Sequence, residues 1–214
     1  MLDFYAEIRL KGDAYGPGFS NGLTLTGGPT TTGLTVQEES KDRTVYVDSR
    51  GYRVEVWHQQ RGEVVDCKTV FYNDSQAPVT IEMISSFALK GITAERLYRI
   101  QSFWSAEGRL LCQNLVDLNM EPSWSRFGVR DEKFGQIGSM PVRKWFPFVA
   151  LEDPNTGAFV GAQLYCASSW QMEVFRTQEP LHLCGGLADR DYGHWCKTVA
   201  PGESFETPRA VVAQ

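Results

Sequence analysis

Short stretches in which apolar and polar residues alternate recur along the chain. In residues 52–58, Val54 and Val56 fall on one face of an extended chain. Arg53, Glu55 and Trp57 fall on the other face. A period of two residues is typical of strands, and no window of about 11 residues sustains a helical period. The strands predicted in this way cover residues 43–48, 52–58, 64–72, 79–89, 98–104, 109–118, 157–167, 170–176 and 194–199.

Turn-forming residues separate these stretches. Ser49-Arg50-Gly51 lies between two alternating runs and predicts a β-hairpin. Asp153-Pro154-Asn155, Gly185-Gly186 and Pro201-Gly202 are interpreted as further turns. Many short strands at regular spacing predict an all-β chain, folded as one large antiparallel β-sandwich over residues 1–214.

The two ends of the sequence indicate a piece of a longer protein. The chain starts close to a stretch rich in Gly, Thr and Pro, and residues 208–214 have the pattern of a strand that leads into further protein. We therefore expect the domain to be incomplete at its amino terminus and to precede another domain.

Charge and composition exclude several classes of partner. The net charge is −5 and Lys and Arg are not clustered, so nucleic acid is not an expected partner. No apolar run reaches the roughly 18 residues that span a bilayer, and the first residues do not form a signal peptide, so no membrane partner is expected. The five cysteines are odd in number and lack a CxxC pair, which is typical of reduced thiols in a cytoplasmic protein.

Two H-x-C pairs are the only pattern that suggests a metal. If His182 paired with Cys196 in antiparallel strands, Cys184 would lie opposite His194 and one face would carry the ligand set of a tetrahedral zinc site. The spacing matches no zinc signature, which favours the alternative of two buried thiols and two hydrogen-bonded histidines. No cofactor is therefore expected.

The sequence lacks a convincing catalytic constellation. There is no G-x-S-x-G elbow for a nucleophilic serine. A glycosidase needs two carboxylates held at a defined separation, and Glu107 and Glu173 are the acidic residues among aromatics that we considered for this role. Nothing in their spacing connects them, so no catalytic residue is assigned.

A sugar-binding surface needs exposed aromatic rings beside hydrogen-bonding groups. Alternation places Trp170 in the core and Gln171 and Glu173 on the surface. Trp124 and Trp145 lie near Pro and Gly, where exposure is expected. The candidate sugar-binding residues are Trp124, Arg126, Arg143, Trp145, Gln171, Glu173, Asp189 and Arg190. For Asp189-Arg190-Asp191 the alternative is a solvated turn.

Several ordered motifs resemble the amino-terminal domain of glycoside hydrolase family 36 α-galactosidases, over most of residues 20–214. The most specific is the closing Pro201-Gly202-Glu203-Ser204-Phe205-Glu206-Thr207-Pro208, similar to the family's PGESF-x-TP stretch. The others are Ser102-Phe103-Trp104-Ser105-Ala106-Glu107, Phe134-Gly135-Gln136-Ile137-Gly138-Ser139-Met140-Pro141, Phe146-Pro147-Phe148, Trp170-Gln171-Met172-Glu173 and Gly185-Gly186-Leu187-Ala188-Asp189-Arg190.

The resemblance implies a galactose-mutarotase-like β-supersandwich that packs on a catalytic (β/α)₈ barrel of the same parent chain. The parent would act on terminal α-galactosides, with catalytic aspartates in the barrel, and this domain would contribute to oligomer contacts or to the substrate entrance. No segment here resembles the catalytic motifs, and about 250 residues of alternating strands and helices are missing. The resemblance therefore implies an accessory domain with no catalytic residue of its own.

Two other functions stay open. An aldose epimerase needs a histidine pair and a carboxylate around a cleft, and His58, His182 and His194 are present without a spacing that favours them. A free-standing carbohydrate-binding module would need exposed aromatic rings. The accessory domain instead predicts an exposed apolar patch where the barrel would pack.

Overall fold

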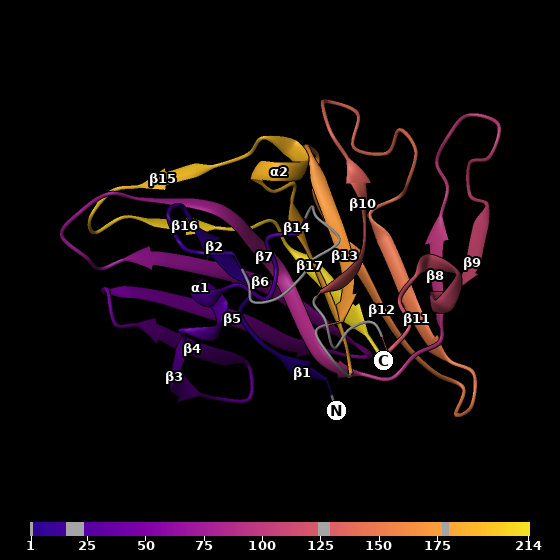
Figure 1. Ribbon diagram of the computed structural model, residues 1–214, viewed down its shortest axis with the longest axis horizontal. Helices are drawn as coiled ribbons and strands as arrows, with labels where there is room; N and C mark the ends of the chain where they lie inside the picture. The colour runs from indigo at the N-terminus through magenta and orange to yellow at the C-terminus, as the bar shows by residue number, and fades with distance from the viewer. Residues whose placement is uncertain (1, 16–23, 124–128, 177–179) are drawn as a thin grey trace.

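The computed structural model describes residues 2–15, 24–123, 129–176 and 180–214, and in these ranges the strands form two antiparallel sheets (Figure 1). The smaller sheet has seven strands and the larger has ten. The smaller sheet runs in the order β1 (Asp3–Phe4), β7 (Val79–Ile92), β14 (Leu181–Leu187), β13 (Trp170–Arg176) and β10 (Arg130–Gln136), with β2 (Ile8–Leu10) and β15 (Lys197–Val199) paired to β7.

The larger sheet holds both early and late parts of the chain. Its order is β3 (Thr35–Glu39), β4 (Arg43–Asp48), β5 (Tyr52–Arg61), β6 (Val64–Asn73), β17 (Ala210–Ala213), β12 (Ala158–Leu164), β11 (Phe148–Asp153), β8 (Arg96–Ile100) and β9 (Leu110–Asn114), with β16 (Ser204–Glu206) paired to β6. The helical elements are the short α1 (Pro29–Thr32), α2 (Arg190–Gly193) and the 3₁₀ turn η1 (Leu115–Leu118). The prediction of an all-β supersandwich is confirmed.

The apolar core fills the space between the two sheets. Phe87 and Leu89 of the smaller sheet belong to one buried cluster with Val149 and Val212 of the larger sheet. The long strand β7 also places Ile81 in a second cluster, which includes residues of β5 and β6. Because β7 contributes to both clusters, as β6 does with Val65 and Phe71, these two long strands join the two ends of the core (Figure 1).

Gly185 and Gly186 are not a turn, as the sequence suggested, but lie inside β14. A Cβ on Gly186 would lie 2.8 Å from the carbonyl oxygen of Ile84, and a Cβ on Gly185 would lie 2.8 Å from the ring of Phe87. The glycines therefore allow β14 to pack closely against β7, next to an irregularity in their pairing.

The other predicted turns and most predicted strands are observed. The hairpin between β4 and β5 has Asp48 paired with Tyr52 across Ser49-Arg50-Gly51. Three predicted strands end early: the chain leaves β8 at Ile100, β9 at Asn114 and β12 at Leu164. The chain that follows β8 forms an exposed loop, which belongs to the candidate site.

Candidate functional site

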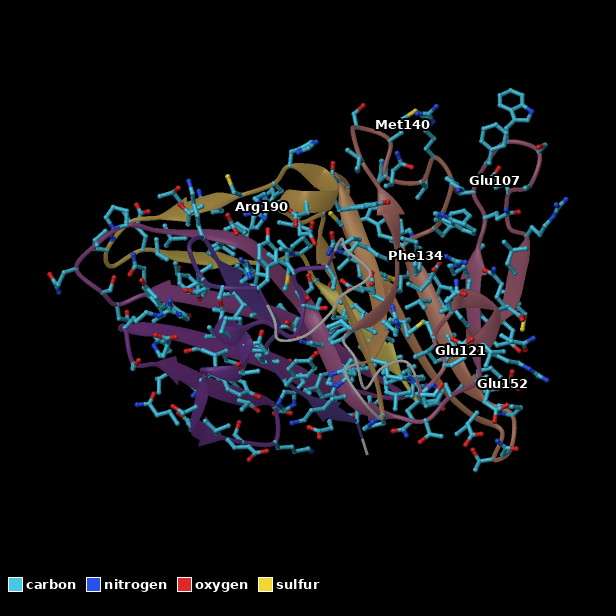
Figure 2. The ribbon with its side chains drawn as sticks, in the orientation of Figure 1. Glu107, Glu121, Phe134, Met140, Glu152 and Arg190 are labelled. Atoms are coloured by element: carbon cyan, nitrogen blue, oxygen red, sulfur yellow. The ribbon has the colours of Figure 1, made fainter. Side chains whose placement is uncertain are left out.

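Two loops near one end of the sandwich expose large apolar side chains. The first loop joins β8 to β9 and carries Phe103, 56% exposed, and Trp104, 93% exposed. The second follows β10 and carries exposed Ile137, Met140 and Val142. We call these five residues the tip patch. Glu107 of the first loop and Met140 of the second both lie along the upper edge in Figure 2.

Backbone hydrogen bonds hold the two loops together. The amide of Ser102 donates to the carbonyl oxygen of Lys144 at 3.0 Å, and its hydroxyl donates to the carbonyl oxygen of Val142. Gln101 and Trp145 form an isolated antiparallel bridge. The tip patch is therefore carried by one connected platform and not by two independent loops.

Trp145 lies in the core, and the expectation that its ring is exposed is wrong. Its ring meets Phe134 at right angles with centroids 6.1 Å apart, and the Arg99 guanidinium lies 4.8 Å from the ring centroid. Trp170 anchors the same loop from below, because its indole nitrogen donates to the carbonyl oxygen of Pro141 at 2.5 Å. Two buried tryptophans thus fix the backbone that presents the patch.

The exposure of the tip patch has no explanation within the sandwich. A tryptophan that is 93% exposed gains almost nothing from burial on folding. Apolar side chains gathered on one surface are characteristic of an interaction site. Four of its five residues lie in the segments 102–107 and 134–141, two of the motifs on which the family resemblance rests.

A cluster of charged side chains lies buried on the outer face of the smaller sheet. The ammonium of Lys133 on β10 lies 2.8 Å from a carboxylate oxygen of Asp189 and 3.6 Å from one of Glu173. Gln171 and Asp189 exchange two hydrogen bonds, of 3.0 Å and 2.8 Å. The predicted alternation of β13 is confirmed for Trp170, which faces the core.

Gln171 and Glu173 do face away from the core, but the prediction that they are surface groups is wrong. The amino-terminal part of the chain covers them: Thr24 and Thr26 both donate hydroxyl hydrogen bonds to one oxygen of Glu173. Glu173 and Asp189 have no exposed surface. A sugar hydroxyl therefore has no access to this cluster, and its role in this arrangement is structural.

The electrostatics of the cluster follow from its burial. Burial raises the pKa of Glu173 to about 7, although the Lys133 charge opposes the increase. Burial alone would lower the pKa of Lys133. The neighbouring carboxylates of Glu173 and Asp189 have the larger effect, and the pKa of Lys133 lies above its ordinary value. Lys133 is charged, because two carboxylates face its single ammonium group.

Asp189 and Arg190 do not form the solvated turn that was considered for them. Asp189 is the N-cap of α2, where its side chain accepts a hydrogen bond of 2.7 Å from the Tyr192 amide. Arg190 is half-buried and pairs with Glu82 at 2.8 Å. Arg190 also donates to the Tyr15 hydroxyl at 2.8 Å, so it fixes the amino-terminal segment over the sheet.

The other sequence candidates are not brought together. Arg143 is exposed beside the tip patch, and Trp124 and Arg126 lie outside the described residues. Glu107 is exposed in the first loop (Figure 2). Glu173 is instead enclosed under the amino-terminal segment. The structure therefore does not form a pair of accessible carboxylates from these two residues.

The register assumed for the zinc set is wrong. His182 on β14 is paired with Phe175 of β13, and Cys184 is paired with Glu173. His194 and Cys196 precede β15, which pairs with the far end of β7 at residues 79–81. Within the described ranges, no group of three or more His, Cys, Asp or Glu side chains is placed to hold a metal ion.

The three histidines considered for an epimerase also lie apart. His58 is on β5 of the larger sheet and stacks on Phe4 with ring centroids 5.1 Å apart. His182 is on the smaller sheet, stacked on Phe175 at 4.7 Å. Burial lowers the pKa of His182 to about 4, so it is neutral near pH 7. His194 follows α2 in a left-handed backbone conformation.

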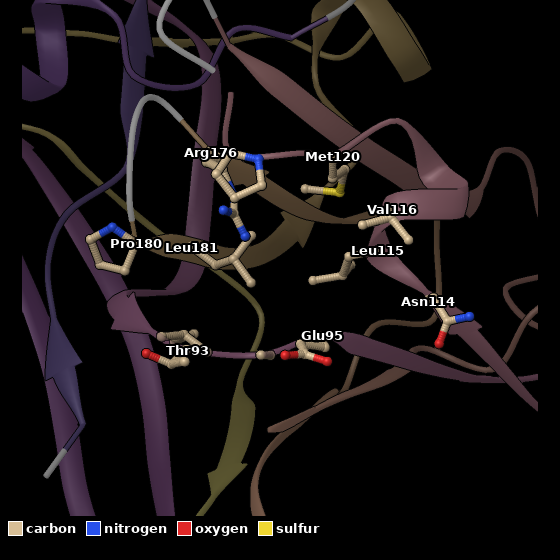
Figure 3. Close-up of a pocket in the computed structure, with 12 residues that line it drawn as sticks. Thr93, Glu95, Asn114, Leu115, Val116, Met120, Arg176, Pro180 and Leu181 are labelled. Atoms are coloured by element: carbon tan, nitrogen blue, oxygen red, sulfur yellow. The ribbon is translucent and has the colours of Figure 1, made fainter. Parts of the chain in front are cut away.

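A pocket of about 380 Å³ that the sequence did not indicate opens between the end of β7, the start of β14 and η1 (Figure 3). Leu115, Met120 and Leu181 form an apolar wall, and Glu95 and Arg176 are its charged lining groups. Nothing in the sequence pattern identified it, because its residues come from three separate stretches, within 92–95, 114–122 and 176–181, and share no motif.

None of the helices formed by the described residues has the length and apolar character that a membrane-spanning helix requires.

Comparison with solved structures identifies the fold. An α-galactosidase from Lactobacillus brevis matches 97% of this chain with a TM-score of 0.64 and 17% sequence identity, over 27% of its own length. The family 36 α-galactosidase AgaB from Geobacillus stearothermophilus matches 97% with a TM-score of 0.64 and 19% identity, over 28% of its length. An AgaA variant of the same organism, in complex with 1-deoxygalactonojirimycin, matches 99% with a TM-score of 0.65 and 16% identity, over 32% of its length.

No family model and no curated protein sequence matches the chain. At these identities the structural likeness shows the fold, and at this level the resemblance inferred from the motifs is confirmed. The chain spans about 27 to 32% of the length of the three α-galactosidases described.

Proposed function

We propose that this chain is the non-catalytic accessory domain at the amino terminus of an α-galactosidase-like glycoside hydrolase. The observation that carries the proposal is the tip patch, which docks the domain on a (β/α)₈ catalytic barrel of the same parent chain. The match to less than a third of each α-galactosidase supports it, because the remaining length is where a barrel would lie.

The domain is assigned a positioning role and no chemistry. Glu107 and Glu173, the two carboxylates considered for catalysis, lie apart. The buried cluster around Lys133 has no access to solvent. Neither arrangement therefore provides the acid and base of glycoside hydrolysis. By contact with the barrel, the tip patch shapes the entrance for a terminal α-galactoside or contributes to subunit contacts in a homo-oligomer of the parent. The five free cysteines support a cytoplasmic location.

The docking proposal is tested with the parent protein divided into two polypeptides, this chain and the downstream barrel. We expect the two to associate, and hydrolysis of a chromogenic α-galactoside to require the barrel. Replacing both Phe103 and Trp104 by Ser removes the largest apolar contacts and is expected to weaken association at least about tenfold, equivalent to about 1.4 kcal/mol. Isothermal titration calorimetry measures this loss.

Val36→Ser is the matched control, because Val36 has the same 56% exposure as Phe103 but lies on β3 at the edge of the larger sheet. This variant is expected to bind the barrel normally. Equal affinity of the patch variant and the control would overturn the proposal, as would hydrolysis by this chain alone.

A further inference from the structure

The outer face of the larger sheet is hollowed where two strands share one partner. Strand β16 pairs with β6 at residues 70–72, and β17 pairs with β6 at residues 64–67. Between them Thr207 bonds with Thr69, its amide donating to the Thr69 carbonyl oxygen and its hydroxyl accepting from the Thr69 amide, both at 3.0 Å. The chain bends there, and the hollow beside it measures about 480 Å³.

Polar side chains of three neighbouring strands line this hollow, which we call the outer groove. They are Trp57, Gln59 and Arg61 of β5, Asp66 and Lys68 of β6, Glu206 of β16, and Arg209 before β17. Alternation accounts for their common side, because Val56 and Val65, which directly precede Trp57 and Asp66, are buried in the core. The outer groove is thus on the face of the larger sheet that points away from the smaller one.

Trp57 is held in one orientation at the wall of the outer groove. Its indole nitrogen donates to a carboxylate oxygen of Glu55 at 3.2 Å. The cationic groups of Arg43 and Lys68 lie over the ring, at 5.2 Å and 6.0 Å from its centroid. The ring is half-buried and lies on β5, an interior strand of the larger sheet. A fixed and partly open aromatic ring can accept the apolar C–H face of a pyranose.

The charged groups of the outer groove are fixed by one another. The Asp66 side chain is 14% exposed and lies between two guanidinium groups, with Nε of Arg61 at 2.5 Å and Nε of Arg209 at 2.7 Å. Lys68 pairs with Glu206 at 2.8 Å. Each cation faces a carboxylate, although Arg61 and Arg209 share Asp66, so the groove offers fixed hydrogen-bond donors and acceptors and carries one positive charge in excess.

We propose that the outer groove binds a neutral mono- or disaccharide unit of an oligosaccharide. The pyranose ring stacks on Trp57, and its hydroxyls bond to Gln59 and to the free edges of the Asp66 and Arg209 groups. The volume suits one or two sugar rings, and pre-fixed side chains lose little conformational freedom on binding. An anion is less suited, because no cation is left without a carboxylate. The proposal does not depend on docking to a barrel.

The test is a titration of this chain with melibiose and raffinose, followed by NMR at the Trp57 indole N–H. That resonance is assigned by its loss in Trp57→Phe. We expect a saturable shift with a dissociation constant in the millimolar range. Trp57→Ala is expected to weaken binding at least about fivefold, because an aromatic contact is lost. Trp104→Ala removes a tryptophan of the tip patch and is expected to leave the affinity unchanged.

A second variant tests the groove without changing the half-buried Trp57, whose replacement could disturb folding. Gln59 and Arg61 are exposed, so Gln59→Ala with Arg61→Ala keeps the sheet intact and is expected to weaken binding, read by saturation-transfer NMR on the sugar. No saturable shift at about 50 mM sugar would overturn the proposal. So would equal loss of affinity in Trp104→Ala, or a shift produced by inorganic phosphate and not by sugar. Failure here leaves the barrel titration unaffected, which keeps the two proposals distinguishable.

Discussion

Gly135 of β10 is paired with Gln171 of β13, and a Cβ on Gly135 would lie 2.8 Å from the Cα of Gln171 and still closer to the carbonyl oxygen of Trp170. Backbone atoms cannot move away as a side chain can, so Gly135→Ala forces the two strands apart. We expect a loss of about 2 kcal/mol in the free energy of unfolding, measured by urea denaturation.

Gly161→Ala is the control for this change. Gly161 also lies in a strand, but its Cβ would have only ordinary contacts, the nearest at 3.6 Å. This variant is expected to be neutral or slightly stabilising, because alanine reduces the freedom of the unfolded chain. Equal losses in both variants would show that the close approach at Gly135 is not the cause.

Lys133→Met is expected to destabilise the protein strongly. It leaves the buried carboxylates of Glu173 and Asp189 without their ammonium partner, which costs about 3 kcal/mol. Lys68→Met removes a lysine whose side chain is 40% exposed in its pair with Glu206, and is expected to change stability by less than about 1 kcal/mol. Thermal denaturation of both variants compares them. A small effect at Lys133 would mean that the carboxylates are protonated in the folded chain.

The buried carboxyl group of Glu7 is expected to make the stability of the protein depend on pH. Its carboxylate accepts hydrogen bonds from the Tyr5 hydroxyl at 2.8 Å and the Gly27 amide at 2.9 Å, yet burial raises its pKa from 4.5 to about 7. Between these two values the folded chain retains a proton that the unfolded chain has lost. Stability is therefore highest below pH 4.5 for this group and falls as the pH rises to about 7.

The expected decrease from this group is about 3 kcal/mol, and Glu7→Gln removes it because an amide does not titrate. Urea denaturation at about pH 5 and about pH 8 measures the difference between the two proteins. If the variant and the natural protein lose stability in parallel, another group, such as Glu173, causes the decrease.

The strand pattern predicted most of the sheets because a period of two residues is local information. The errors occur where contacts between distant segments decide. Gly185-Gly186 has the composition of a turn, but close packing against Ile84 and Phe87 requires glycine inside a strand. Residues 102–104 have a strand-like composition, but β8 ends at Ile100. After it, Gln101 forms only an isolated bridge with Trp145, and residues 102–104 are not part of a strand.

The candidate site was predictable only in part. The segments 102–107 and 134–141 were singled out by resemblance, and they form the platform of the tip patch. Exposure was predicted wrongly for Trp145, since a neighbouring proline does not reveal that Phe134 and Arg99 enclose the ring. Burial of Glu173 depends on Thr24, which is 149 residues away in sequence, so no local pattern indicates it.

The position of β17 has a consequence for biosynthesis. This strand, residues 210–213, lies between β6 and β12 and joins the two halves of the larger sheet. A nascent chain that ends before residue 210 would expose one open edge on β6 and another on β12, both able to pair with the wrong chain. The larger sheet can therefore close only after β17 has left the ribosomal exit tunnel. Chaperone protection is most useful before β17 pairs with β6 and β12.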